Sequence, residues 1–224
     1  MDRLQVAFDQ SIPQFKCSEC VRCTSVFGTS LCKTKGRGCC FYFPEFGLYD
    51  LHRMAVSLEG LQLLDVIRHK PGVVINPYSI YVKGSFDREG YEEYLKGGEL
   101  INEDSINDQT LFFRVCPFVR SEHGCTLSPK HRTLVCNFFV CSEILGRAEI
   151  RDELVPYLEE RSRYARWEHR ENTELQHMLL ENDVNLVTDF KASIEVLQNL
   201  SLNIYEFPAL EPVDYLSDEF SRGA

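Results

Sequence analysis

Apolar residues recur at helical spacing directly after Pro44. The repeat consists of Leu48, Leu51, Ala55 and Leu58. Charged residues lie off this stripe, namely Asp50, Arg53 and Glu59. The pattern predicts an amphipathic helix. Gly60 is expected to separate it from a second helix over residues 61–70, which Pro71 and Gly72 end.

Short β-branched and aromatic runs follow these helices. Residues 73–83 predict one or two strands, with a break at Asn76 and Pro77. Residues 84–109 are polar and predict a loop that contains a short helix over 91–96. Residues 111–115 predict another strand, and residues 121–124 predict a turn after which 125–127 pair back as a hairpin.

The pattern becomes helical after Cys141, and no cysteine occurs from residue 142 to 224. Two apolar stripes mark the expected helices: Tyr164, Trp167, Leu175, Met178 and Leu179, then Val187, Phe190, Ile194 and Leu197. A row of arginines in the first helix is surrounded by Glu159, Glu160, Glu168 and Glu171, which predicts a solvated charged face. From Pro208 onward we expect an extended acidic tail.

We therefore expect an α-rich fold with minor β structure. Residues 1–145 would form an irregular domain organised by cysteines and metal, with a short β-hairpin, and residues 146–224 a helical extension. Hydrophobic residues make up 44% of the 224, which is enough for an ordinary core. Cysteines are thus not needed to replace a missing core.

The formal net charge is -10, which argues against a general nucleic-acid binder and against attraction to an anionic membrane. Charges interrupt the first residues, so they lack the apolar run of a secretory signal. No stretch has the roughly 20 apolar residues of a spanning helix. These observations predict a cytoplasmic protein.

The chain has ten cysteines, in two groups. The first group is Cys17, Cys20, Cys23, Cys32, Cys39 and Cys40, and the second is Cys116, Cys125, Cys136 and Cys141. In a reducing compartment so many cysteines are more often metal ligands or reactive thiols than disulfides. Five disulfides would be the alternative. We treat all ten cysteines as candidate metal ligands.

The first three cysteines have the spacing C-x2-C-x2-C. Zinc sites usually combine two separated C-x2-C units, whereas this run is typical of one corner of an iron–sulfur cluster. Pro117 after Cys116 is also typical of such clusters. We expect one centre to use this triplet and one further cysteine. A second centre would combine the Cys39–Cys40 pair with downstream cysteines. His123 and His131 are less favoured ligands, and we expect them to be surface residues of a turn.

These motifs resemble those of the YkgJ-type cysteine-cluster family, described as a zinc- or iron-chelating domain with a CxxCxxCC pattern. The similarity covers about residues 17–141. It rests on the N-terminal triplet, Gly38-Cys39-Cys40, Cys116-Pro117-Phe118, Gly124-Cys125-Thr126-Leu127 and Cys136 to Cys141. In this chain residues 24–38, including Cys32, separate Cys23 from the adjacent pair. The resemblance implies metal chelation, and some members of the family are labelled iron–sulfur oxidoreductases.

Nucleotide-binding and zinc-protease motifs are missing from the sequence, so nicotinamide or flavin chemistry is unsupported. We expect a [4Fe–4S] protein that transfers electrons or supports a partner enzyme, for example one that modifies protein side chains. The alternative is a structural zinc module that binds another protein. A zinc enzyme with one open coordination position is a third interpretation.

Overall fold

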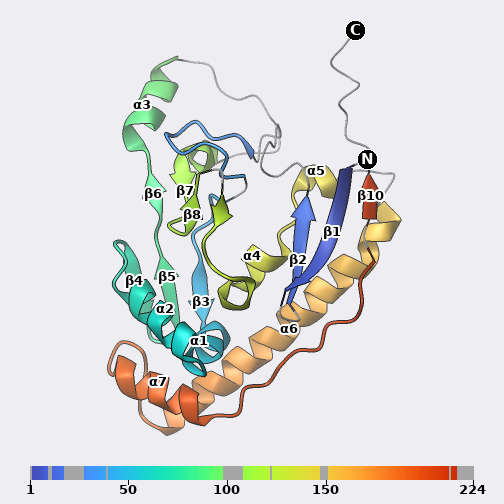
Figure 1. Cartoon of the computed structure of the whole chain (residues 1–224). Helices are drawn as coiled ribbons and strands as arrows, with labels where there is room; N and C mark the ends of the chain where they lie inside the picture. Colours follow the sequence, from blue (N-terminus) through green and yellow to red (C-terminus); the bar gives the residue numbers. More distant parts are fainter. Residues whose placement is uncertain are drawn as a thin grey trace.

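The computed structural model describes residues 2–9, 12–17, 28–38, 40–97, 108–121, 123–146, 151–211 and 213–215. Within these ranges helices predominate and the strands form small antiparallel sheets (Figure 1). The α-rich fold with minor β structure that the sequence predicts is confirmed.

One sheet joins the two ends of the chain. Strand β1 (Asp2–Asp9) lies between β2 (Ile12–Cys17) and β10 (Val213–Tyr215), and both pairings are antiparallel. The sequence pattern did not predict these strands. Leu4, Val6 and Phe8 alternate as in a strand and are a local signal for β1, whereas the pairing with β10 joins segments that are distant in the sequence.

The first predicted helix is present as α1 (Leu48–Ala55), which follows the short strand β3 (Glu45–Gly47). The break before α2 (Leu58–Arg68) lies at Val56 and Ser57, so the break predicted at Gly60 is wrong. Ser57 Oγ accepts a 3.1 Å hydrogen bond from the Gly60 N–H and caps α2. Leu58 consequently belongs to α2, and 74% of its surface is exposed.

The predicted strands of residues 73–83 are present as a hairpin of β4 (Val73–Asn76) and β5 (Ser79–Val82). Strand β3 pairs with the other edge of β5. The hairpin is followed by β6 (Ser85–Phe86) and by α3 (Arg88–Gly97), which is the short helix expected in this region.

The strand predicted over residues 111–115 is largely wrong. A 3₁₀ helix, η3 (Gln109–Phe113), occupies most of it, and only β7 (Arg114–Val115) is extended and pairs with β6. The side chain of Asp108 accepts a 3.1 Å hydrogen bond from the Thr110 N–H, which favours a helical turn over a strand.

The predicted hairpin near Cys125 is present as β8 (Val119–Arg120) and β9 (Gly124–Cys125). It is followed by a 3₁₀ helix, η4 (Pro129–His131), and then by α4 (Leu134–Phe138) and α5 (Ser142–Leu145). Two of the four downstream cysteines lie in these elements: Cys125 in β9 and Cys136 in α4.

Two helices form most of the C-terminal part: α6 (Arg151–Glu181) and α7 (Phe190–Asn199). Both pack against α1, and the extended residues 200–211 run along α6 (Figure 1). The main hydrophobic cluster includes Phe46, Leu51, Ile67, Ile80, Leu179 and Leu197. The boundary near residue 145 stays a prediction, but residues from both sides of it share this core.

The charged face predicted for α6 is partly wrong. Glu160 is 2% exposed and Glu168 is 9% exposed, so both carboxylates are inside the protein. The Tyr205 hydroxyl, from the extended segment, donates a 2.6 Å hydrogen bond to Glu160. None of the described helices has the length and apolar character that crossing a membrane requires.

Candidate metal centre

Cys40 and Cys116 lie side by side on neighbouring segments. The Cys116 N–H donates a 3.0 Å hydrogen bond to the Cys40 carbonyl oxygen. Cys40 follows a turn in which its own N–H donates to the Arg37 carbonyl oxygen at 3.2 Å. The backbone therefore fixes the spacing of two cysteines from distant parts of the sequence.

The β8–β9 hairpin brings Cys125 back toward Cys116. Cys125 pairs with Val119, whose N–H donates a 3.1 Å hydrogen bond to the Cys116 carbonyl oxygen. Gly124 allows the tight return because its φ of +81° is in the left-handed region. The Phe118 N–H also donates to the Cys116 thiol, a contact that favours a thiolate.

Cys136 lies on the short helix α4. The Thr133 hydroxyl, at the start of this helix, donates a 3.3 Å hydrogen bond to Cys136 Sγ. The next residue, Asn137, anchors the helix because its Nδ2 donates a 3.0 Å hydrogen bond to the Pro129 carbonyl oxygen. Asn137 Oδ1 accepts a 2.8 Å hydrogen bond from Gln14 of β2.

The thiols of Cys40, Cys116, Cys125 and Cys136 share one neighbourhood, and we call them the thiol group. Burial, and to a smaller extent the thiols of Cys125 and Cys136, raise the pKa of Cys40 to about 11. Burial also raises the pKa of Cys116 to about 12, with smaller effects of the other three thiols. The pKa of Cys136 is raised by burial and by Cys125, although the residue as a whole is exposed.

Two guanidinium groups oppose these effects. Arg132 and Arg37 lower the pKa of Cys40, and Arg132 also lowers that of Cys136. Arg37 is 2% exposed and donates to the carbonyl oxygens of Thr29 at 2.9 Å and Leu111 at 3.0 Å. Positive charge is therefore held in place beside the thiol group.

Within the described ranges, no group of three or more His, Cys, Asp or Glu side chains could hold a metal ion. The electrostatic effects above, rather than a closed ligand shell, connect the four thiols. Cys40, Cys116, Cys125 and Cys136 are free thiols.

The other predicted ligands lie elsewhere or outside the described residues. Cys32 is buried, and its thiol donates to the Thr34 carbonyl oxygen at 3.6 Å. Cys141 packs against a separate cluster that includes Ile144 and Tyr157. Cys17 ends β2, but its side chain is not among the described ones. Cys20, Cys23 and Cys39 fall outside the described residues, so the predicted triplet centre stays a prediction.

The two histidines differ from each other. His123 is exposed on the turn, as predicted, and its Nδ1 lies 2.9 Å from the Ser121 carbonyl oxygen. His131 is only 3% exposed, so its description as a surface residue is wrong. Its Nδ1 lies 3.3 Å from Ser128 Oγ, because η4 turns the ring into the protein.

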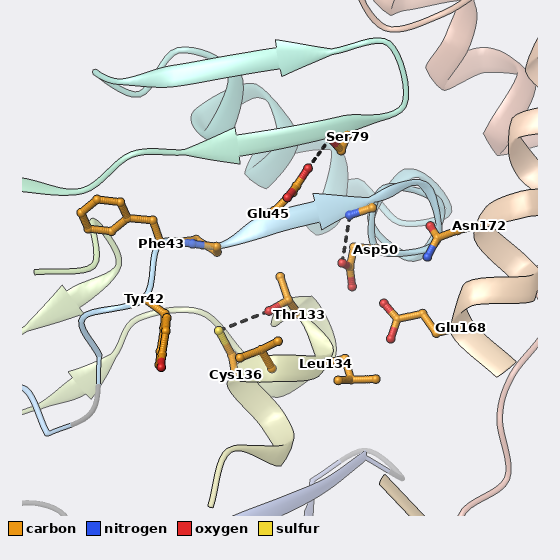
Figure 2. A pocket seen from close by; sticks show the side chains of 13 residues that line it. Tyr42, Phe43, Glu45, Asp50, Ser79, Thr133, Leu134, Cys136, Glu168 and Asn172 are labelled. Carbon is orange, nitrogen blue, oxygen red and sulfur yellow. Dashed lines mark hydrogen bonds between the residues drawn. The ribbon is translucent and has the colours of Figure 1, made fainter. Parts of the chain in front are cut away.

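A cavity of about 420 Å³ adjoins the thiol group, and Cys136 lies in its wall (Figure 2). Asp50 of α1 and Glu168 of α6 point into it. Neither residue was predicted to belong to a site, because both occupy ordinary charged positions of amphipathic helices in the sequence. These two carboxylates come together only because α1 packs on α6. The sequence alone contains no signal that pairs them.

No family model matches the chain, and the searches of curated proteins and of solved structures found no match either. The resemblance to the YkgJ-type family therefore stays a prediction. The function must be argued from the residues and their arrangement.

Proposed function

We propose that the chain is a metalloprotein whose centre is bound by Cys40, Cys116, Cys125 and Cys136. Because no three of these side chains are grouped in this structure so that they could hold an ion, metal binding would draw the thiols closer together. The single observation that carries this proposal is the backbone arrangement that brings cysteines of separate segments together. The Cys116 N–H donates a 3.0 Å hydrogen bond to the Cys40 carbonyl oxygen, and the β8–β9 hairpin returns Cys125 toward Cys116. Thiolates are the preferred ligands of zinc and of iron–sulfur clusters. A centre with four thiolates is anionic, and the neighbouring Arg37 and Arg132 would stabilise its charge.

Iron–sulfur chemistry is the version we favour. The Cys116-Pro117 pair supports it at this centre, and the C-x2-C-x2-C run of Cys17, Cys20 and Cys23 supports it for the separate triplet centre. When bound, a [4Fe–4S] cluster would supply one-electron chemistry. The four cysteines would hold it, and the Phe118 N–H would tune its potential through the hydrogen bond to Cys116. The protein would then transfer electrons or support a partner enzyme in the cytoplasm, without binding nucleic acid or membranes.

A structural zinc centre is the second candidate. It is supported by the lack of helices and strands in residues 29–38, the segment that leads to Cys40. Such a segment gains stability when a metal fixes its end. The zinc would hold the segment against the β8–β9 hairpin and create a binding surface for another protein.

Anaerobic purification separates the two candidates. A cluster predicts a brown protein whose visible absorption bleaches with dithionite, with iron and acid-labile sulfide in equal amounts and an electron paramagnetic resonance signal after reduction. A colourless protein with stoichiometric zinc and no sulfide would contradict the iron–sulfur proposal and favour the structural zinc centre.

A further inference from the structure

The cavity beside the thiol group combines apolar and acidic walls. Its apolar residues are Tyr42, Phe43, Pro44, Leu134 and Val135. The side chains of Asp50 and Glu168 line it from α1 and α6, and Figure 2 shows their carboxylates next to each other. Its volume of about 420 Å³ is in the range of small-molecule sites.

Glu168 is the most unusual group of this cavity. The residue is 9% exposed, and its Oε2 atom has no hydrogen-bond partner among the residues that the structure describes. A buried carboxylate oxygen without a partner costs stability whenever it is charged. The side chain nevertheless points into the cavity and not into a network, so its natural partner would be a bound ligand.

The neighbouring Asp50 is already satisfied. It accepts hydrogen bonds from the Gly47 N–H, at 3.2 Å, and from the Arg53 guanidinium, with which it forms an ion pair. One guanidinium therefore faces two carboxylates. Burial, and to a smaller extent Asp50, raise the pKa of Glu168 to about 8. A cationic ligand would supply the missing positive charge.

We propose that this cavity binds an alkylammonium group, with the ammonium at Glu168 and the methylene stem along Tyr42, Phe43 and Leu134. An ammonium is a compact charge with three donors, which suits one buried acceptor oxygen. Its stem would pack on the apolar wall, which extends from Leu134 beside Glu168 toward Tyr42 on the opposite side of the cavity (Figure 2). The ligand is either a free amine or the side chain of a lysine in another protein.

The inference does not depend on a metal. Binding should be measured by calorimetry on the full chain at about pH 9, where the Glu168 carboxylate is ionised and the amines are still protonated, with the metal content determined and matched between samples. The probes are butylamine for a free amine, Nα-acetyl-lysine methylamide for a lysine side chain, and 1-butanol as the neutral control. Saturable binding of either amine, but not of 1-butanol, supports the proposal. The tighter amine identifies the source of the ammonium group.

Glu168→Gln preserves the shape of the side chain and removes its charge. We expect this variant to bind the amine at least about tenfold more weakly. Glu45→Gln is the matched control, because Glu45 lies in the same cavity but accepts a 2.7 Å hydrogen bond from Ser79. It should change affinity less than about threefold.

Tyr42→Ala provides a second variant that leaves the carboxylates intact. It should weaken binding of the longer lysine probe by at most about threefold, through lost apolar contact with the far part of the ligand. Equal affinity of wild type and Glu168→Gln, or no saturable binding of either amine to the wild type, would overturn the proposal. Neither result would bear on the proposed metal centre, because that proposal is tested separately, by metal content.

Discussion

Gln14 Nε2 donates a 2.8 Å hydrogen bond to Asn137 Oδ1, and both side chains are buried. Gln14 also accepts a 3.0 Å hydrogen bond from Arg132. A strand near the N-terminus is thus joined to the helix that carries Cys136. The position of one thiol in the proposed centre consequently depends on a polar network that the sequence motifs do not include.

Replacing Asn137 with Ala should destabilise the protein by about 2 kcal/mol, because buried partners lose their hydrogen bonds. It should also reduce metal loading, since α4 positions Cys136. Chemical denaturation and metal analysis measure the two effects. Asn199→Ala is the control, because exposed Asn199 bonds only within its own helix, to the Glu195 carbonyl oxygen at 2.9 Å. An Asn137→Ala variant as stable as Asn199→Ala would show that the network contributes little.

Gly60 should tolerate no side chain. A Cβ atom there would lie 2.1 Å from the Met54 carbonyl oxygen, so the contact between α1 and α2 would have to open. Gly60→Ala should therefore cost about 2 kcal/mol or more of unfolding free energy.

Gly97→Ala is the natural comparison for that variant. Gly97 ends α3, and a Cβ atom there would meet nothing within 4 Å. We expect this variant to remain within about 0.5 kcal/mol of the wild type, or to gain stability. Equal thermal unfolding midpoints of the two variants would contradict the claim that a side chain at Gly60 forces α1 and α2 apart.

The buried carboxylate of Glu168 should make stability depend on pH. Its pKa in the folded protein is about 8, against an ordinary value of 4.5, so the folded state holds a proton that the unfolded state releases. Stability should therefore fall as the pH rises from about 4.5 to 8 and then level off. Glu168→Gln should remove this pH-dependent loss of stability, because glutamine does not ionise.

The Glu168→Gln variant should consequently be more stable than the wild type by about 2 kcal/mol at pH values above 8, with a gain that shrinks toward pH 5. Denaturation at several pH values checks this, with Glu159→Gln, an exposed position of the same helix, as control. A gain that grew as the pH fell would contradict the assigned direction of the shift.

Elements with a local signal were predictable. Helix α1 and the β4–β5 hairpin follow from the spacing of apolar residues and from the turn residues Asn76 and Pro77. The β1–β2–β10 sheet was not predicted. Its strand β10 comes from a distant part of the sequence, although Leu4, Val6 and Phe8 of β1 alternate as in a strand. The 3₁₀ helix η3 replaced a predicted strand because a side-chain cap at Asp108 outweighed β propensity.

The site was predictable in kind but not in arrangement. Cysteine type and number indicate metal chemistry, whereas the grouping of Cys40 with Cys116 depends on a backbone hydrogen bond between distant segments. Asp50 and Glu168 could not be recognised, since a charged residue on an amphipathic helix is normally solvated. Their burial results from the packing of α1 on α6.

The metal content of Cys116→Ser tests the central claim most directly. Iron, zinc and acid-labile sulfide should be measured per chain in anaerobically purified wild type, Cys116→Ser and Cys32→Ser. The wild type should contain metal, and Cys116→Ser should lose the metal of one centre. Cys32→Ser should have the metal content of the wild type, because the Cys32 thiol is hydrogen-bonded to the Thr34 carbonyl oxygen and not to the thiol group. A wild type without metal, or a Cys116→Ser variant with the full wild-type content, would contradict the proposed centre.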